Sequence, residues 1–222
     1  MTKSELSKSH FANTLIRSLR ILSVALLMIT VIGCDTDRPL SDPQTAEIDP
    51  KLLGTWTALE PVTSRKVFLF IGRHSVKDDP NGIIEISLVE YDQKKQKIGA
   101  PQVIFGSITT IGQHRLLNIF YNGDKPATLD DGYLAWAHSN KRSCVILSYN
   151  TDGASLTASR LGGKKYGQLL ESQTLTQNTN SRGVSAESLI AYIQKFGANG
   201  IVEPFGLFDD TVVRPLVFKK SS

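Results

Sequence analysis

The pattern of hydrophobic and polar residues divides the chain into one long apolar run near its start and a series of short segments after residue 51. The apolar run spans residues 21–33 and follows a stretch with four basic residues and one acidic residue. The later segments are rich in β-branched and aromatic residues, and turns that contain Gly, Pro, Asn or Asp separate them. Such spacing is typical of an antiparallel sheet whose strands pair in sequence order.

The strand-like segments differ in how clearly they alternate. Between Ile84 and Leu88 every second residue is apolar, and the Asn81-Gly82 pair just before them is a strong hairpin signal. Pro215 would remove a ladder donor, which predicts an edge strand or a bulge. The segments lie at 67–71, 82–91, 102–110, 115–121, 133–137, 143–149 and 154–161, and a further one lies within 201–218. The sequence therefore predicts a mainly β domain, an antiparallel barrel or sandwich.

Two segments break the strand pattern. Residues 185–196 carry apolar side chains at helical spacing, with Ser185 placed to cap the first turn and Gly197 to end the helix. The apolar stripe predicts packing against the sheet and not a cofactor site. The polar stretch 164–176 predicts a short helix around residues 166–171.

The first 34 residues have the features of a secretory signal peptide, namely a basic start, a short apolar run and a small residue at the exit. The run is shorter than the roughly 20 residues that a spanning helix needs. Val31-Ile32-Gly33-Cys34 resembles the lipobox of bacterial lipoproteins, in which a peptidase cuts before the cysteine and the cysteine is acylated. The resemblance implies a signal peptide over residues 1–33 and a lipid on Cys34. An uncleaved membrane helix is the alternative.

Residues 35–50 contain three prolines, several acidic residues and few apolar ones. This composition predicts a flexible tether, so that residues 34–50 are the lipidated cysteine with its tether and residues 51–222 are the β-rich domain. In enterobacterial lipoproteins an aspartate after the cysteine favours retention in the inner membrane. Asp35 thus implies a slight preference for the inner over the outer membrane of a bacterial cell envelope, with the domain facing the periplasm.

Charge and cysteine content agree with an exported protein. The formal net charge of +4 falls to +1 when the leader is removed, with 21 basic and 20 acidic residues left. The mature part has no Lys/Arg cluster with interleaved aromatic residues, so no nucleic acid partner is expected. Of the two cysteines, acylation would use Cys34. Cys144 then stands alone in an apolar run, which predicts a small buried core residue.

No motif in the mature part predicts catalysis, a cofactor or a bound metal. His74, His114 and His138 are isolated from one another, whereas metal sites usually contain a close pair of ligands. The nucleophile elbow, the dinucleotide-binding glycines and the phosphate loop are also missing from the sequence. We therefore expect a protein that is not an enzyme. An envelope enzyme that uses Asp130, Asp131 and His138 is the weaker alternative.

Gly54-Thr55-Trp56, at the start of the domain, resembles the Gly-X-Trp opening of the lipocalin and lipocalin-like barrels. The resemblance implies that Trp56 closes the base of a barrel and packs against an arginine from a late strand, for which Arg214 is the candidate. Stacking of this kind contributes about 0.5–2 kcal/mol. A similar opening is found in bacterial lipoproteins with a Leu-Thr strand after an Asp-Gly turn, here Asp152-Gly153 and Leu156-Thr157.

These features lead to two functional hypotheses. The first is a non-enzymatic envelope lipoprotein that is attached to the bilayer through Cys34 and binds a small apolar ligand or a partner, because barrel mouths are usual ligand sites. The alternative is a structural or accessory subunit of an envelope protein assembly, without a ligand cavity.

Overall fold

The structure is a computed structural model that describes residues 35–60, 65–122, 125–127, 132–140, 142–161, 163–177, 183–198, 201–204 and 217–221. In this part of the chain eight antiparallel strands form a closed barrel, in which each strand pairs with the next and the last pairs with the first. They are β2 (Gly54–Glu60), β3 (Arg65–Arg73), β4 (Ile83–Asp92), β6 (Gln102–Ile111), β7 (His114–Asn122), β9 (Arg142–Thr151), β10 (Ser155–Leu161) and β12 (Val217–Lys220). The predicted antiparallel barrel and the pairing in sequence order are confirmed.

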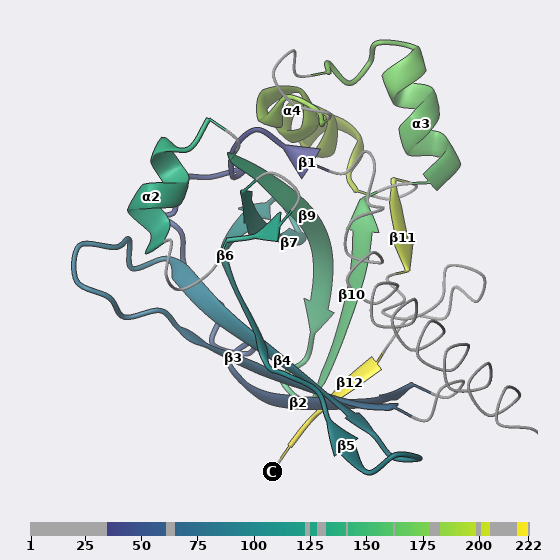
Figure 1. Cartoon of the computed structure of the whole chain (residues 1–222). Helices are drawn as coiled ribbons and strands as arrows, with labels where there is room; N and C mark the ends of the chain where they lie inside the picture. Colours follow the sequence, from purple (N-terminus) through teal and green to yellow (C-terminus); the bar gives the residue numbers. More distant parts are fainter. Residues whose placement is uncertain are drawn as a thin grey trace, which may run out of the picture. The chain divides into compact units, whose positions relative to one another are not determined.

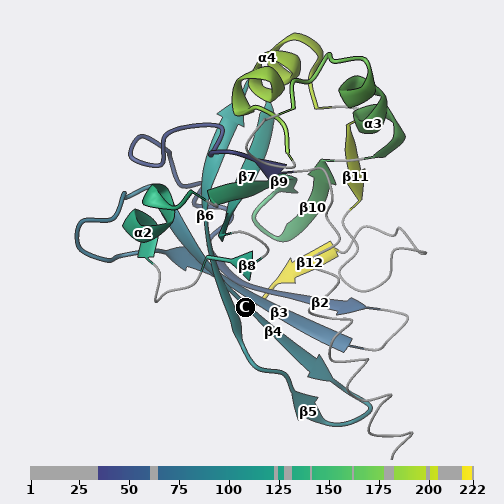
Figure 2. The same cartoon turned by 45° about the horizontal axis from the view of Figure 1, so that its top comes forward.

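Short strands and helices lie around this barrel (Figures 1 and 2). The short strands are β1 (Asp35–Thr36), β5 (Lys97–Ile98), β8 (Lys125–Pro126) and β11 (Val202–Pro204), and the helices are α2 (Gly132–His138), α3 (Gly163–Glu171) and α4 (Ala186–Phe196). Both views place α3 and α4 near each other and α2 apart from them. The Ser185 side chain accepts a hydrogen bond from the Ser188 amide, and Gly197 ends α4 with a φ of 74°. Leu189, Tyr192 and Ile193 are buried, which confirms these members of the predicted packing stripe, whereas Phe196, its last member, is exposed.

Residues 133–137 form most of helix α2, so the strand predicted there is wrong. Aromatic packing explains the helix. The ring of Trp136 stacks on that of Phe120, with centroids 4.4 Å apart, and Tyr133 contacts both rings. A helix brings residues three positions apart onto one face, which a strand cannot do. Trp136 Nε1 also donates a hydrogen bond to the Tyr121 carbonyl at 2.7 Å.

The base of the barrel is the end that contains Gly54 and Thr151, and the mouth is the opposite end, where β2 ends and β9 begins. The chain just before β2 closes the base. Trp56 is fully buried and its Nε1 donates to the Leu52 carbonyl at 2.8 Å. Arg115 and the Tyr149 hydroxyl both donate to Asp49, at 3.0 and 3.3 Å. Burial and the charge of Asp49 raise the pKa of Tyr149, so its hydroxyl stays protonated and able to donate.

The wall between β10 and β2 is closed only near the base. Strand β12 has four residues, pairing with residues 155–157 of β10 and with residues 56–57 of β2. Nearer the mouth, residues 159–161 of β10 pair with β11 instead. Among the described strands, the last three residues of β2 pair only with β3.

The segment from Asp35 to Pro50 packs against the barrel, so the predicted flexible tether is wrong for these residues. Strand β1 pairs with β9, and Thr36 is fully buried. The Leu40 amide donates to Asn118 Oδ1 at 2.9 Å. The Gly82 amide donates to the Pro43 carbonyl at 3.2 Å. The physical reason is that the outward faces of β6 and β7 offer buried polar partners to this segment, Asn118 for the Leu40 amide and Thr109 for the Ser41 hydroxyl, and its prolines favour an extended path.

Candidate functional site

On strands β4 and β6 the inward-facing apolar side chains become more exposed toward the mouth. On β4, Ile84 and Ile86 are buried, whereas Leu88, the next inward-facing residue, is half-buried. On β6 the buried Ile108 is followed toward the mouth by the half-buried Ile104. The half-buried inward side chains Leu69, Leu88, Ile104 and Leu147 form what we call the mouth layer. On β3 and β9 a buried residue, Val67 or Val145, lies one inward position nearer the mouth than this layer. Solvent therefore reaches an apolar surface that is recessed within the barrel.

An ion pair lies next to this layer, one inward position closer to the mouth on β4. Arg65 Nη1 lies 3.2 Å from Glu90 Oε2, and the two side chains are 26% and 22% exposed. Burial raises the pKa of Glu90, and the guanidinium of Arg65 offsets only part of that effect. The rim therefore offers a poorly hydrated charged pair beside apolar side chains, which suits a small molecule with an apolar body and a polar end.

At the base, a cation from the last strand does lie over Trp56. Lys220 Nζ is 5.2 Å from the centre of the Trp56 ring. Gly54 has a φ of 128°, and a Cβ there would lie 2.9 Å from Lys220 Cε, which explains the glycine in this motif. Arg214, the partner implied by the lipocalin resemblance, lies outside the described residues. The sequence does contain an indication of this position for Lys220. Lys220 lies two residues after the apolar Phe218, so in a strand the two side chains face the same side of the sheet.

The other sequence-predicted residues lie only partly within the described chain. Cys34, Asp130 and Asp131 lie outside the described residues. His138 is exposed at the end of α2. Cys144 is fully buried on β9, which confirms the expected core position.

A polar cluster that the sequence did not suggest lies between β3 and β4. His74 Nε2 is 2.8 Å from Asp79 Oδ2, and His74 Nδ1 is 3.9 Å from Glu85 Oε2. The imidazole packs edge-on against Phe105 at 4.8 Å. The His74 amide also donates to the Ile83 carbonyl, so the cluster holds the loop between the two strands in place. Within the described residues no group of His, Cys, Asp and Glu is arranged to hold a metal ion.

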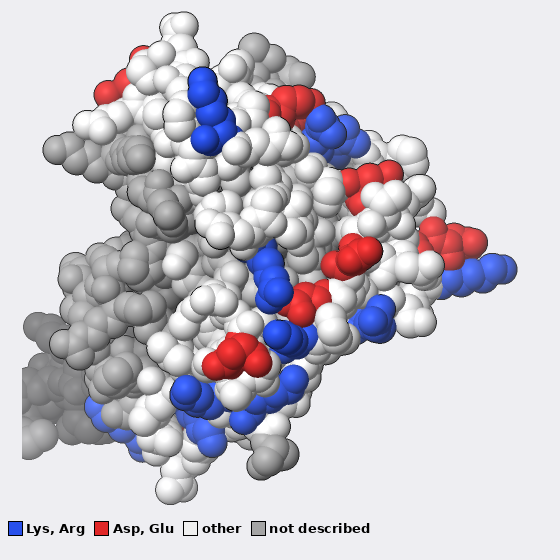
Figure 3. Space-filling view, turned by 180° about the vertical axis from the view of Figure 1, so that it is seen from behind, with Lys and Arg blue, Asp and Glu red and all other residues white. Residues whose placement is uncertain are grey.

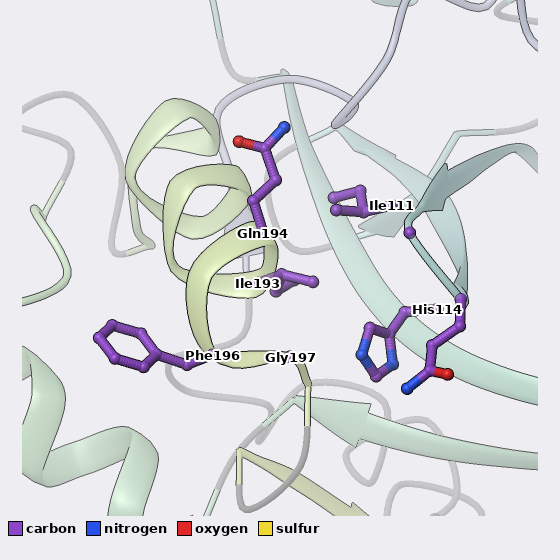
Figure 4. Close-up of a pocket in the computed structure, with 8 residues that line it drawn as sticks. Ile111, His114, Ile193, Gln194, Phe196 and Gly197 are labelled. Atoms are coloured by element: carbon purple, nitrogen blue, oxygen red, sulfur yellow. The ribbon is translucent and has the colours of Figure 1, made fainter.

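A second hollow lies outside the barrel, between the end of α4 and the turn that joins β6 to β7 (Figure 4). Its volume is about 410 Å³. Ile193 points toward Ile111 and His114, whereas Phe196 points away from them. The Ala198 amide donates to His114 Nε2 at 3.3 Å, which fixes the end of the helix to this turn.

Comparison of the chain with protein-family models, curated proteins and solved structures gave no match. Within the described residues, none of the helices has the length and apolar character needed to cross a bilayer. The function therefore has to be argued from the barrel itself. The mouth layer is the stronger candidate site, because it joins recessed apolar side chains with a charged rim.

Proposed function

We propose that this chain is a lipid-anchored protein of the bacterial cell envelope whose barrel binds a small apolar ligand at its mouth and catalyses no reaction. The observation that carries the proposal is the mouth layer, where inward-facing apolar side chains remain half-buried in a barrel whose other inward side chains are mostly buried. Covering such side chains with a ligand is favourable by about 0.8 kcal/mol for each methylene removed from water.

The rim defines the class of ligand further. A molecule with a short alkyl tail would place the tail on Leu88 and Ile104, and its polar end would reach the ion pair of Arg65 and Glu90. A tail that buries about four methylenes gains about 3 kcal/mol. We therefore expect weak binding, in the millimolar range, and a preference for short amphipathic molecules.

Ligand binding can be tested with a fluorescent short-chain fatty acid titrated into the purified full-length protein. Leu88→Gln places an amide in the mouth layer and should weaken binding about tenfold or more. Val89→Gln is the matched control, since Val89 is the next residue on the strand and faces outward. Equal effects of the two variants, or no binding by the wild type, would refute a ligand site at the mouth.

The anchor is tested separately by feeding cells labelled palmitate. The wild type should take up the label and fractionate with membranes, and Cys34→Ala should lose the label. Cys144→Ala is the control, because this second cysteine is buried inside the fold and its loss should leave labelling intact. Labelling of Cys34→Ala at the wild-type level would contradict acylation at this residue.

A structural or accessory role is the second candidate, and the hollow beside α4 favours it. Phe196 lies at the edge of this hollow and is 56% exposed. The hollow is separate from the mouth layer and its ion pair. A photo-crosslinking amino acid at position 196 should capture one specific envelope protein in cells. The same amino acid at the exposed Gln168 on α3 should not. Capture from neither position, or equally from both, would contradict this role.

A further inference from the structure

The outer surface of the barrel carries exposed apolar side chains at the mouth end. Leu59, Ile98 and Val217 are 56%, 66% and 44% exposed. Leu59 and Ile98 belong to one row that crosses β2, β3, β4 and β5 in register, through Lys66 and Tyr91. The outward face of an antiparallel sheet is ordinarily polar, so an apolar row in this position indicates a surface that is covered in use.

Lysines surround this row. Lys66 lies within it, with Nζ 5.0 Å from the centre of the Phe68 ring. Lys94, Lys95 and Lys97 are exposed in and beside the β4–β5 turn, where only Lys95 has an ion-pair partner among the described residues, Asp92 at 3.0 Å. Seen from behind, Lys and Arg side chains gather in the lower part of the molecule, where Figure 1 places β5 (Figure 3). Apolar side chains mixed with lysines are the chemistry that binds an anionic membrane surface.

The start of the described chain lies at this same end of the barrel. Strand β10 ends at Leu161, and its Arg160 pairs with Leu147 of β9. The edge of β9 beyond that point is taken by β1, where Asp35 pairs with Val145. Asp35 therefore lies just past the mouth end of β10. Residue 34 is bonded directly to Asp35, so a lipid on it would have no tether between it and the barrel.

We propose that the barrel docks mouth-first on a phospholipid surface with anionic headgroups. The docking surface consists of Leu59, Ile98 and Val217 with Lys66, Lys94, Lys95 and Lys97. The proposal rests on the acylation of Cys34 that is proposed above, and it adds the orientation of the barrel and the chemistry of its partner. In this orientation an apolar ligand passes between the bilayer and the mouth layer without crossing water.

The orientation can be measured with the acylated protein in vesicles of phosphatidylcholine and phosphatidylglycerol that carry a spin-labelled headgroup. A fluorophore at Ile98→Cys should be quenched severalfold more strongly than one at Val76→Cys. Val76 is the matched control, since it is also an exposed apolar residue but lies in the loop after β3, at the base. Each lysine near an anionic surface strengthens the contact about fivefold. K94E/K97E should therefore weaken quenching at position 98, whereas K77E, in the base loop, should not.

The possible outcomes separate the docking from the anchor. Equal quenching at positions 98 and 76 of a palmitate-labelled protein would overturn the docking while the anchor stands. A protein without palmitate would overturn the anchor and the docking with it. Shielding of position 98 from the quencher together with crosslinks between two copies of the chain would show that a second copy covers this surface, and that result also refutes docking on lipid.

Discussion

The packing of the N-terminal segment on the barrel depends on one buried side chain, Asn118 of β7, which is fully buried. Its Nδ2 donates to the Ser107 carbonyl at 3.0 Å and to Thr109 Oγ1 at 2.9 Å. Its Oδ1 accepts the hydrogen bond from the Leu40 amide at 2.9 Å. Replacing Asn118 with Leu keeps the size of the side chain and removes all of these hydrogen bonds.

The expected cost follows from these contacts. The Leu40 amide would be left without its acceptor in a residue that is 6% exposed, which costs about 1–3 kcal/mol. The two lost bonds to β6 cost about 1 kcal/mol each. Asn118→Leu should therefore lower the free energy of unfolding by about 3–5 kcal/mol and the melting temperature by about 10 °C in a domain of this size. A typical domain is stable by about 5–15 kcal/mol, so the variant should still fold.

Urea denaturation followed by tryptophan fluorescence measures the change in stability, and hydrogen exchange measures the Leu40 amide directly. In Asn118→Leu that amide should exchange much faster, because it has lost its acceptor. Asn150→Leu is the control, since Asn150 is exposed on the neighbouring strand β9 and should change stability by less than about 0.5 kcal/mol. If Asn118→Leu is as stable as this control and the Leu40 amide stays protected, the segment is not held to the barrel as described.

Three further substitutions test other parts of the barrel. Gly82→Ala should destabilise the fold by about 1–3 kcal/mol in urea denaturation, because a Cβ there would lie 2.3 and 2.6 Å from backbone oxygens of the segment that covers it; an unchanged midpoint would contradict this packing. Lys220→Met should cost about 1 kcal/mol through the lost contact with Trp56, whereas Lys219→Met, on the exposed face, should cost little. Burial raises the pKa of Glu90 above its ordinary value of 4.5, so the folded protein binds this proton more tightly than the unfolded chain does. The wild type should then gain stability relative to Glu90→Gln as the pH falls from 7 toward about 4.5, and a relative loss over that range would show that the shift has the opposite sign.

Strands with one buried face could be predicted from the sequence, and strands with two buried faces gave a signal that was harder to interpret. Alternation between Ile84 and Leu88 locates β4, whose outward side chains from Glu85 to Tyr91 are half-buried. On β7 only Asn118 interrupts the apolar run, and Leu116 and Phe120 on its outward face are as buried as Ile119 on its inward face. A continuous run indicates burial on both faces. Such a run does not indicate which segment of the chain packs on the outward face of the strand, because that packing depends on contacts between residues far apart in the sequence.

The same limit explains the errors at the N-terminal segment and at α2. Proline and acidic residues in residues 35–50 are typical of a tether when the segment is considered by itself. The segment is ordered because Asn118 of β7, which is 78 residues from Leu40 in the sequence, lies beside it and accepts the Leu40 amide. Likewise, Trp136 favours a helix only because Phe120 offers a ring to stack on. For the site, the resemblance to the Gly-X-Trp opening implies an arginine on Trp56, whereas the cation that the structure describes over this ring is Lys220. The pairing of Trp56 with Arg214 stays a prediction.

The ordered segment changes what a lipid at residue 34 would do to the protein. Fixing the backbone of a residue costs about 1–2 kcal/mol, so ordering residues 35–50 has to be offset by the burial of Thr36, Leu40 and the outer face of the barrel. A pull on the lipid would act directly on β1, which contributes only two residues to the sheet. Contact between the mouth-end surface and the bilayer would relieve that load, because it spreads the attachment over Leu59, Ile98 and the neighbouring lysines. A lipid attached directly next to β1 and a docking surface at the same end of the barrel would therefore hold the protein on the bilayer together. With a long flexible tether the lipid would put no load on β1, and the docking surface would not be needed to carry it.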